Sequence, residues 1–90
     1  MAPNFEIQKF RTSDMLHMEL LGDFDGSSAV ELINTLKEHR IGVDTICVNA
    51  RGLRKIYAFG REVIQKNIAG IQALEPYILF IGGNLGQKTV

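Results

Sequence analysis

One cysteine and two histidines are the side chains of this 90-residue sequence best suited to nucleophilic catalysis. A catalytic triad needs a Ser or Cys nucleophile beside a His that an acid orients. Cys47 lies in the middle of a short apolar segment, where a small buried side chain is its usual role. His17 alternates with apolar residues, and His39 lies near the expected end of a helix, where a cation complements the dipole. Because these residues form no catalytic pair, we predict no catalytic residue and no enzymatic activity.

Two carboxylates, Asp23 and Asp25, lie close together in the sequence and could act as metal ligands or as a hydrolytic acid pair. A metal site needs clustered ligands, and no third ligand is adjacent to these two. Paired-carboxylate hydrolysis needs a second acid on a facing segment, and none is evident. We predict instead that both side chains bond the backbone around Gly22 and Gly26, and we expect no metal.

The glycine-containing segment 82–86 follows an apolar run and could cradle a phosphate. The known phosphate-binding loops require a helix that starts directly after the glycines, with its N-terminus aimed at the phosphate. Only four residues follow Gly86. We therefore predict no nucleotide and no other cofactor, and we expect residues 82–90 to be a mobile tail.

Composition bounds the class of protein. With 46% hydrophobic and 22% charged residues, the chain is expected to fold as one soluble domain spanning residues 1–90, not as a disordered segment. A single cysteine excludes a disulfide framework, and no apolar run approaches the roughly 20 residues of a membrane span. The first residues do not resemble a secretory signal. We expect a cytoplasmic protein without membrane insertion.

Charge is unevenly distributed, although the net charge is zero. That balance argues against nucleic-acid binding, which usually appears as a basic domain. Residues 1–44 carry a net charge of −4 and residues 45–90 a net charge of +4. Two interpretations remain open for the basic group: solvated side chains around a helix start, or a patch that attracts an acidic partner. Its members are Arg51, Arg54, Lys55, Arg61 and Lys66.

Hydrophobic spacing predicts the elements that hold these residues. Residues 5–11 and 15–21 alternate between apolar and polar side chains, which is typical of a β-hairpin. A helix is expected to start at Ser27 or Ser28, with Glu31 completing a capping box if Ser28 is the cap, and to stop near Gly42. Residues 45–49 and 77–81 read as strands buried on both faces. Residues 51–57 read as a loop and residues 58–74 as a second helix that Pro76 ends.

The order ββαβαβ predicts an α/β domain with a mixed four-stranded sheet and helices packed mainly on one face. One core should lie between the sheet and the helices. Its predicted members are Leu16, Met18, Leu20, Leu32, Ile33, Leu36, Ile46, Val48, Val63, Ile64, Ile68, Leu79 and Ile81.

A set of short segments follows a pattern known from one protein family. The segments are Leu21-Gly22-Asp23-Phe24-Asp25, Ser28-Ala29, Glu31-Leu32, Val48-Asn49-Ala50-Arg51-Gly52-Leu53 and Ile56-Tyr57-Ala58-Phe59-Gly60. They resemble those of STAS domains, the bacterial anti-sigma factor antagonists and their relatives. The resemblance covers roughly residues 5–81 and implies a STAS-like fold. In that family a serine at the start of the second helix is phosphorylated by a partner kinase that also acts as an anti-sigma factor.

This chain departs from the family at that switch, because Ala58 and Phe59 occupy the serine positions, Tyr57 replaces the preceding acid, and Asn49 replaces an earlier one. The resemblance therefore implies a divergent, non-enzymatic interaction module without serine phosphorylation. Its implied partner is a protein such as a kinase-like anti-sigma factor or a related regulator.

We predict that the partner-binding surface consists of Arg54, Lys55, Tyr57, Ala58 and Phe59. The two basic residues would steer an acidic partner, and the two aromatic residues would supply the contact area that anchors it. The alternative for Phe59 is that it fills the core under the helix start, and the alternative for Tyr57 is that it covers a sheet edge. The alternative function is a small-ligand or anion-binding STAS-like domain associated with transport or lipid trafficking, with free N–H groups at the helix start as donors.

Overall fold

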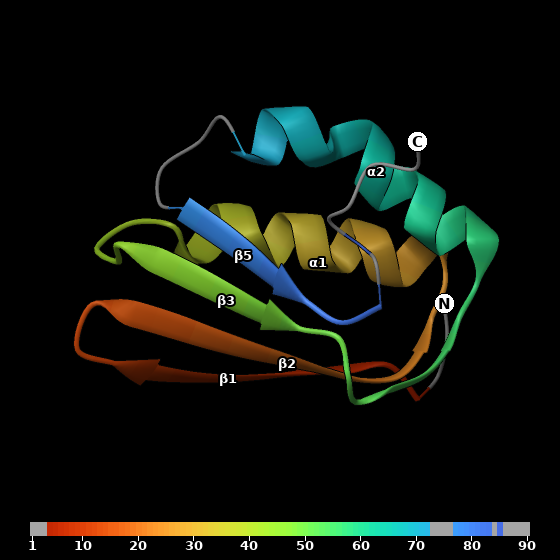
Figure 1. Cartoon of the computed structure of the whole chain (residues 1–90), viewed down its shortest axis with the longest axis horizontal. Coiled ribbons are helices and arrows are strands. Elements are labelled where there is room, and N and C mark those ends of the chain that lie inside the picture. The colour runs from red at the N-terminus through yellow and green to blue at the C-terminus, as the bar shows by residue number, and fades with distance from the viewer. Residues whose placement is uncertain (1–3, 73–76, 84, 86–90) are drawn as a thin grey trace.

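A computed structural model describes residues 4–72, 77–83 and 85 of the chain. The described elements, in chain order, are β1 (Glu6–Thr12), β2 (Met15–Phe24), α1 (Gly26–His39), β3 (Thr45–Asn49), β4 (Leu53–Ile56), α2 (Ala58–Gln72) and β5 (Tyr77–Ile81). Both helices lie on the same side of the sheet (Figure 1). The α/β class and the one-sided helix layer predicted from the sequence are confirmed.

The described residues form a sheet of five strands, so the predicted count of four is wrong. Strands β1 and β2 form an antiparallel hairpin, and β2, β3 and β5 are parallel neighbours. Strand β3 leaves β2 after Asn49, and β4 then pairs with the far end of β2, with a register shift between Gly22 and Asp23. The expected loop 51–57 thus contains a strand, and β2 continues to Phe24 beyond the predicted Leu21. The alternation rule misses β4 because the strand has four residues and its pairing with β2 shifts register partway along.

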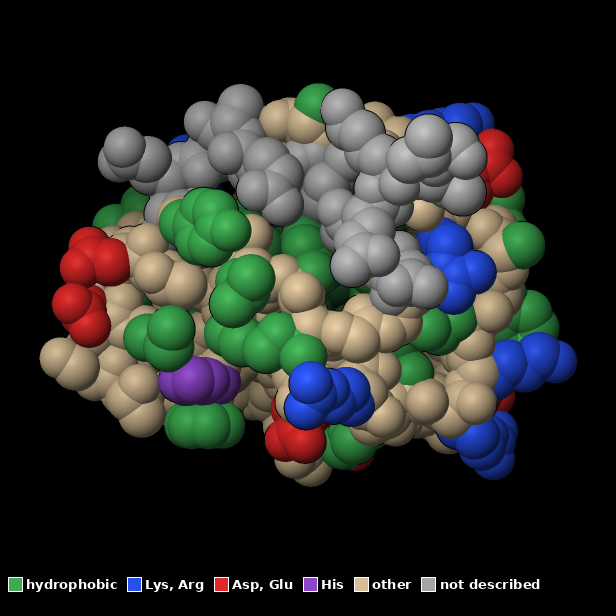
Figure 2. Space-filling view, in the orientation of Figure 1, with side chains coloured by type: hydrophobic (Ala, Val, Ile, Leu, Met, Phe, Trp, Pro, Cys, Tyr) green, Lys and Arg blue, Asp and Glu red, His purple; other side chains and the backbone are tan. Residues whose placement is uncertain are grey.

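The predicted alternation of β2 is confirmed, and it determines where the core lies. Leu16, Met18 and Leu20 are buried, while His17 and Glu19 point to the other face. The helices cover only the first of these faces. On the opposite face, hydrophobic side chains surround a histidine at the surface (Figure 2). The residues of the predicted core that are buried are Leu16, Met18, Leu20, Leu32, Ile33, Leu36, Ile46, Val48 and Ile64.

The prediction that strand β5 is buried on both faces is wrong. Ile78 is buried, whereas Leu79 is 40% exposed and Ile81 only partly buried. Since the helices cover one face only, alternate residues of this edge strand face solvent. The predicted core residue Val63 packs against the core while partly exposed, and the side chain of Ile68 lies outside the described residues.

Residues 82–90 were expected to form a mobile tail. Leu85, which lies in this segment, is fully buried and belongs to the core cluster. Residue 84 and residues 86–90 lie outside the described residues, as do the last two residues of the predicted second helix, 73 and 74.

Helix α1 begins at Gly26, with Asp25 as its N-cap, so the predicted cap at Ser27 or Ser28 and the capping box with Glu31 are wrong. The Asp25 carboxylate accepts hydrogen bonds from the backbone N–H of Ser28 at 2.8 Å and from its hydroxyl at 2.9 Å. These bonds lower the pKa of Asp25. The aspartate therefore bonds local backbone, as its position between two glycines suggested.

Candidate functional site

The predicted binding surface lies where β4 enters α2, next to the start of α1. The backbone N–H of Tyr57 donates to the Phe24 carbonyl at 2.9 Å, which ties the end of β4 to the end of β2. Gly60 then brings α2 close to α1, because a Cβ at this position would lie 2.8 Å from the Asp25 carbonyl oxygen. Only glycine permits this approach without a shift of the backbone. The starts of both helices are thus held at one end of the molecule.

Arg54 forms a two-pronged ion pair with Asp23. Its Nε donates to Oδ1 at 3.0 Å and its Nη2 to Oδ2 at 2.8 Å. Hydrogen bonding to Arg54 lowers the pKa of Asp23, and the same contact raises the pKa of Arg54. The charge of Arg54 is therefore balanced within the chain, a contact that the sequence prediction of a steering arginine did not include.

Lys55 and Tyr57 interact directly. The lysine Nζ lies 4.6 Å from the centre of the tyrosine ring, a cation–π arrangement. Tyr57 remains 41% exposed. The pair therefore presents a cation and an aromatic surface together, with no ion-pair partner for Lys55 among the described residues.

Phe59 does not fill the core: it is 65% exposed. Its ring leans on the start of α1, where a Cβ on Gly26 would lie 2.5 Å from the ring carbon Cδ2. A groove of about 430 Å³ runs between the two helices at this point, lined by Gly26, Ser27, Val30, Phe59 and Val63. Val30 is itself half exposed. The surface predicted from residues 54–59 thus extends onto α1, which no sequence signal had indicated.

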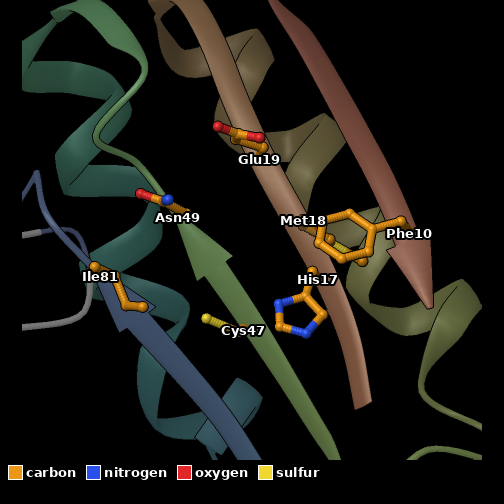
Figure 3. Close-up of a pocket in the computed structure, with 7 residues that line it drawn as sticks. All are labelled: Phe10, His17, Met18, Glu19, Cys47, Asn49 and Ile81. Carbon is orange, nitrogen blue, oxygen red and sulfur yellow. The ribbon is translucent and has the colours of Figure 1, made fainter. Parts of the chain in front are cut away.

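A second hollow lies on the sheet face opposite the helices, and the sequence reasoning did not identify it. Phe10 and His17 stack there with ring centres 4.6 Å apart and ring planes 5° from parallel. Cys47, Glu19, Asn49 and other residues line the hollow, which measures about 290 Å³ (Figure 3). The position of Phe10, out of phase with Ile7 on the same strand, was the available signal. The full lining is Phe10, His17, Met18, Glu19, Cys47, Asn49 and Ile81.

Cys47 is 8% exposed, as its mid-strand position predicted, and burial raises the pKa of its thiol. A raised pKa disfavours the reactive thiolate. Within residues 4–72, 77–83 and 85, no three His, Cys, Asp or Glu side chains are placed to hold a metal ion. Neither described helix is long and apolar enough to cross a membrane.

No protein-family model matches the sequence, and a search of curated proteins finds no match. Solved structures do match. An anti-sigma factor antagonist STAS domain from Rhodobacter sphaeroides aligns with a TM-score of 0.67 and 10% identity, covering 96% of this chain and 95% of that one. The unphosphorylated form of the anti-sigma factor antagonist SpoIIAA aligns with a TM-score of 0.58 and 15% identity, covering 84% of this chain and 70% of that one.

A third neighbour is Mglu in its native form, with a TM-score of 0.74 and 13% identity. The alignment covers 87% of this chain but 26% of the Mglu chain, so the sequence spans about a quarter of that protein. At these identities the likeness concerns the fold. The chain has a STAS-like fold, as the sequence resemblance implied.

Proposed function

We propose that this STAS-like domain is a non-enzymatic regulatory module that binds a protein partner through Arg54, Lys55, Tyr57, Ala58 and Phe59. The observation that carries the proposal is the exposure of Phe59 beside an apolar groove. Large aromatic side chains are usually covered in a folded domain, and they are enriched among the residues that dominate binding energy.

The gain available from covering this surface is appreciable. Complete burial of a phenylalanine side chain is worth about 1.5–3 kcal/mol. Phe59 is still 65% exposed, so a partner that covers it gains roughly 1–2 kcal/mol from this ring alone. Tyr57 and Val30 are also exposed and add apolar area, and Lys55 supplies a charge that an acidic partner residue would meet.

We also propose that binding here is constitutive or controlled from the partner's side. SpoIIAA has been solved in unphosphorylated and phosphorylated forms. In the present chain Ala58 and Phe59 stand where the family has its serines, so the helix start offers no serine hydroxyl to modify. The partner we favour is a kinase-like anti-sigma factor or a related regulator in the cytoplasm.

The anion-binding alternative has less support from the contacts. An anion at the start of α2 would draw on the helix dipole and on nearby bases. Arg54 is already paired with Asp23, whose carboxylate also adds negative charge beside the site. We therefore rank protein binding above anion binding.

Site-specific photo-crosslinking tests the proposal. A benzophenone amino acid replaces Phe59 in one variant and Ile41, which is 82% exposed in the turn after α1, in a control variant. We expect position 59, and not position 41, to capture a partner. The purified partner should then bind Phe59→Ser at least about tenfold more weakly than wild type, with Ile41→Ser unchanged. Capture at position 41 alone, or equal affinity of both variants, would place the binding surface elsewhere.

A further inference from the structure

The sheet face turned away from the helices carries an apolar row that the proposed binding surface does not use. We call the side of β1, β2, β3 and β5 opposite α1 and α2 the open face. Strand pairing aligns Phe10, His17, Cys47 and Leu79 in one row across these four strands. Phe10 is 56% exposed and Leu79 40% exposed, and Tyr77 in the next row is 62% exposed. Contiguous exposed apolar area on one face is a feature of interaction sites.

The row has a hollow along it. The stacked rings of Phe10 and His17 form one wall, and Ile81 from the edge strand forms the other, with Cys47 between them (Figure 3). The His17 Nε2 lies 3.4 Å from the hydroxyl oxygen of Thr12 on the neighbouring strand. The apolar centre is thus shaped by side chains from β1, β2, β3 and β5.

Acidic side chains gather at one end of the open face, whereas Lys and Arg side chains lie toward its other end (Figure 2). Of the charged strand residues, Glu6 and Glu19 alternate onto this face, whereas Lys9 and Arg11 of β1 pair with Met18 and Leu16 and so alternate to the helix side. Arg51 follows β3, and its side chain lies against Gly82 at the end of β5.

Two further acids stand at the opposite end, where β2 and β3 begin. The Asp44 N–H donates to the Asp14 carbonyl at 2.7 Å, which keeps the two residues together. The nearby Asp14 carboxyl raises the pKa of Asp44, as expected for two acids without a cation between them. Figure 2 shows acidic side chains at this end of the apolar area.

This combination selects one kind of occupant. We propose that the open face binds an amphipathic segment of a partner protein whose apolar stripe is flanked by Lys or Arg. The stripe would cover Phe10, Leu79 and Tyr77, and its bases would meet Glu19 and the Asp14–Asp44 pair. An anionic membrane surface or a nucleic acid would instead bring further negative charge against these carboxylates.

A model peptide tests this chemistry directly. The probe is a fluorescent helical peptide of about 18 residues, with leucines on one face and lysines on the other, since shorter helices are marginal in water. A peptide with glutamate at every lysine position is the charge control. We expect the leucine–lysine peptide to bind the whole chain in fluorescence anisotropy, more weakly as salt rises. The leucine–glutamate peptide should bind at least about tenfold more weakly.

Variants locate the binding. We expect Leu79→Lys to weaken the leucine–lysine peptide at least about tenfold, and Asp14→Asn with Asp44→Asn to weaken it about threefold or more and to reduce its salt dependence. Val30→Lys and Phe59→Ser change exposed residues of the helix side and should leave affinity unchanged, which separates this proposal from the proposed function. Circular dichroism checks that each variant is folded.

Several outcomes would overturn the proposal. They are no binding of the lysine peptide by the folded wild type, equal binding of the two peptides, or an equal loss in Val30→Lys and Leu79→Lys. Concentration-dependent dimerisation that Leu79→Lys abolishes would instead assign the open face to a second copy of the chain. Binding to phosphatidylserine vesicles that Leu79→Lys weakens would assign it to a membrane surface.

Discussion

The same change, leucine to alanine, should destabilise the protein much more at position 85 than at position 79. Leu85 has no exposed surface and belongs to the core cluster, whereas Leu79 is 40% exposed on the open face. The sequence pattern predicts the reverse, with Leu79 in the core and residue 85 in a tail. The pair therefore tests the tertiary structure against the sequence reasoning, with residue chemistry held constant.

The expected magnitudes follow from burial. Truncation of a buried leucine to alanine costs about 2–5 kcal/mol, because the lost transfer free energy is joined by the cost of the cavity. For the fully buried Leu85 we expect about 3 kcal/mol. At Leu79 solvent reaches the site and no closed cavity forms, so we expect about 1 kcal/mol. A domain of this size loses about 4–8 °C in Tm per kcal/mol, which gives falls of about 12–24 °C and 4–8 °C.

Thermal unfolding followed by far-ultraviolet circular dichroism measures both shifts, and urea unfolding with an unchanged m-value confirms that the same transition is compared. The wild type and both variants are measured in one buffer at one protein concentration. Equal shifts, or a larger shift for Leu79→Ala, would refute the burial of Leu85 in the core.

Three further predictions concern glycine, capping and charge. Gly60→Ala should lower Tm, because its Cβ would lie 2.8 Å from the Asp25 carbonyl oxygen. Gly70→Ala, whose Cβ would meet nothing within 4 Å, should raise the free energy of unfolding in urea by about 0.5–1 kcal/mol. A rise in stability for both variants would contradict the close approach of the helices. Asp25→Ala should lower Tm, and Asp25→Asn should keep most of the wild-type Tm, because the amide oxygen still accepts a hydrogen bond from the first turn of α1. Equal Tm values for the two variants would show that this capping hydrogen bond does not stabilise the protein. Asp44→Asn should raise Tm at neutral pH, because Asp14 raises the folded-state pKa of Asp44 and the ionised pair lowers stability above that pKa. The gain in Tm should shrink as the pH falls toward about 4, where the carboxyl becomes protonated. A gain that does not depend on pH would exclude the carboxyl pair as its cause.

Local pattern was sufficient for the elements with regular spacing. The alternation of Leu16, Met18 and Leu20 located β2 and its buried face, and the helical spacing of Leu32, Ile33 and Leu36 located α1. In both cases each residue's environment repeats with the period of its own element, so neighbours in the sequence carry the information. The sequence also predicted the burial of Cys47, from its place in the middle of a short apolar segment.

The sequence also placed Arg54, Lys55, Tyr57 and Phe59 on one segment, but it could not say what each side chain contacts. Asp23 is 31 residues from Arg54, and only the pairing of β4 with β2 brings the two together. The sequence around Phe59 is equally compatible with a core position and a surface position. Its exposure depends on Gly26 of α1, which allows the ring to lie on the helix surface.

At β5, only the tertiary structure decided which side chains lie on the open face. In sequence, 77–81 is a continuous apolar run, consistent with burial on both faces, and nothing local distinguishes Ile78 from Leu79. The two described helices both pack on one side, which buries Ile78 and exposes Leu79. Which side of a strand is covered depends on the packing of elements distant in sequence, and a local hydrophobic pattern contains no record of that packing.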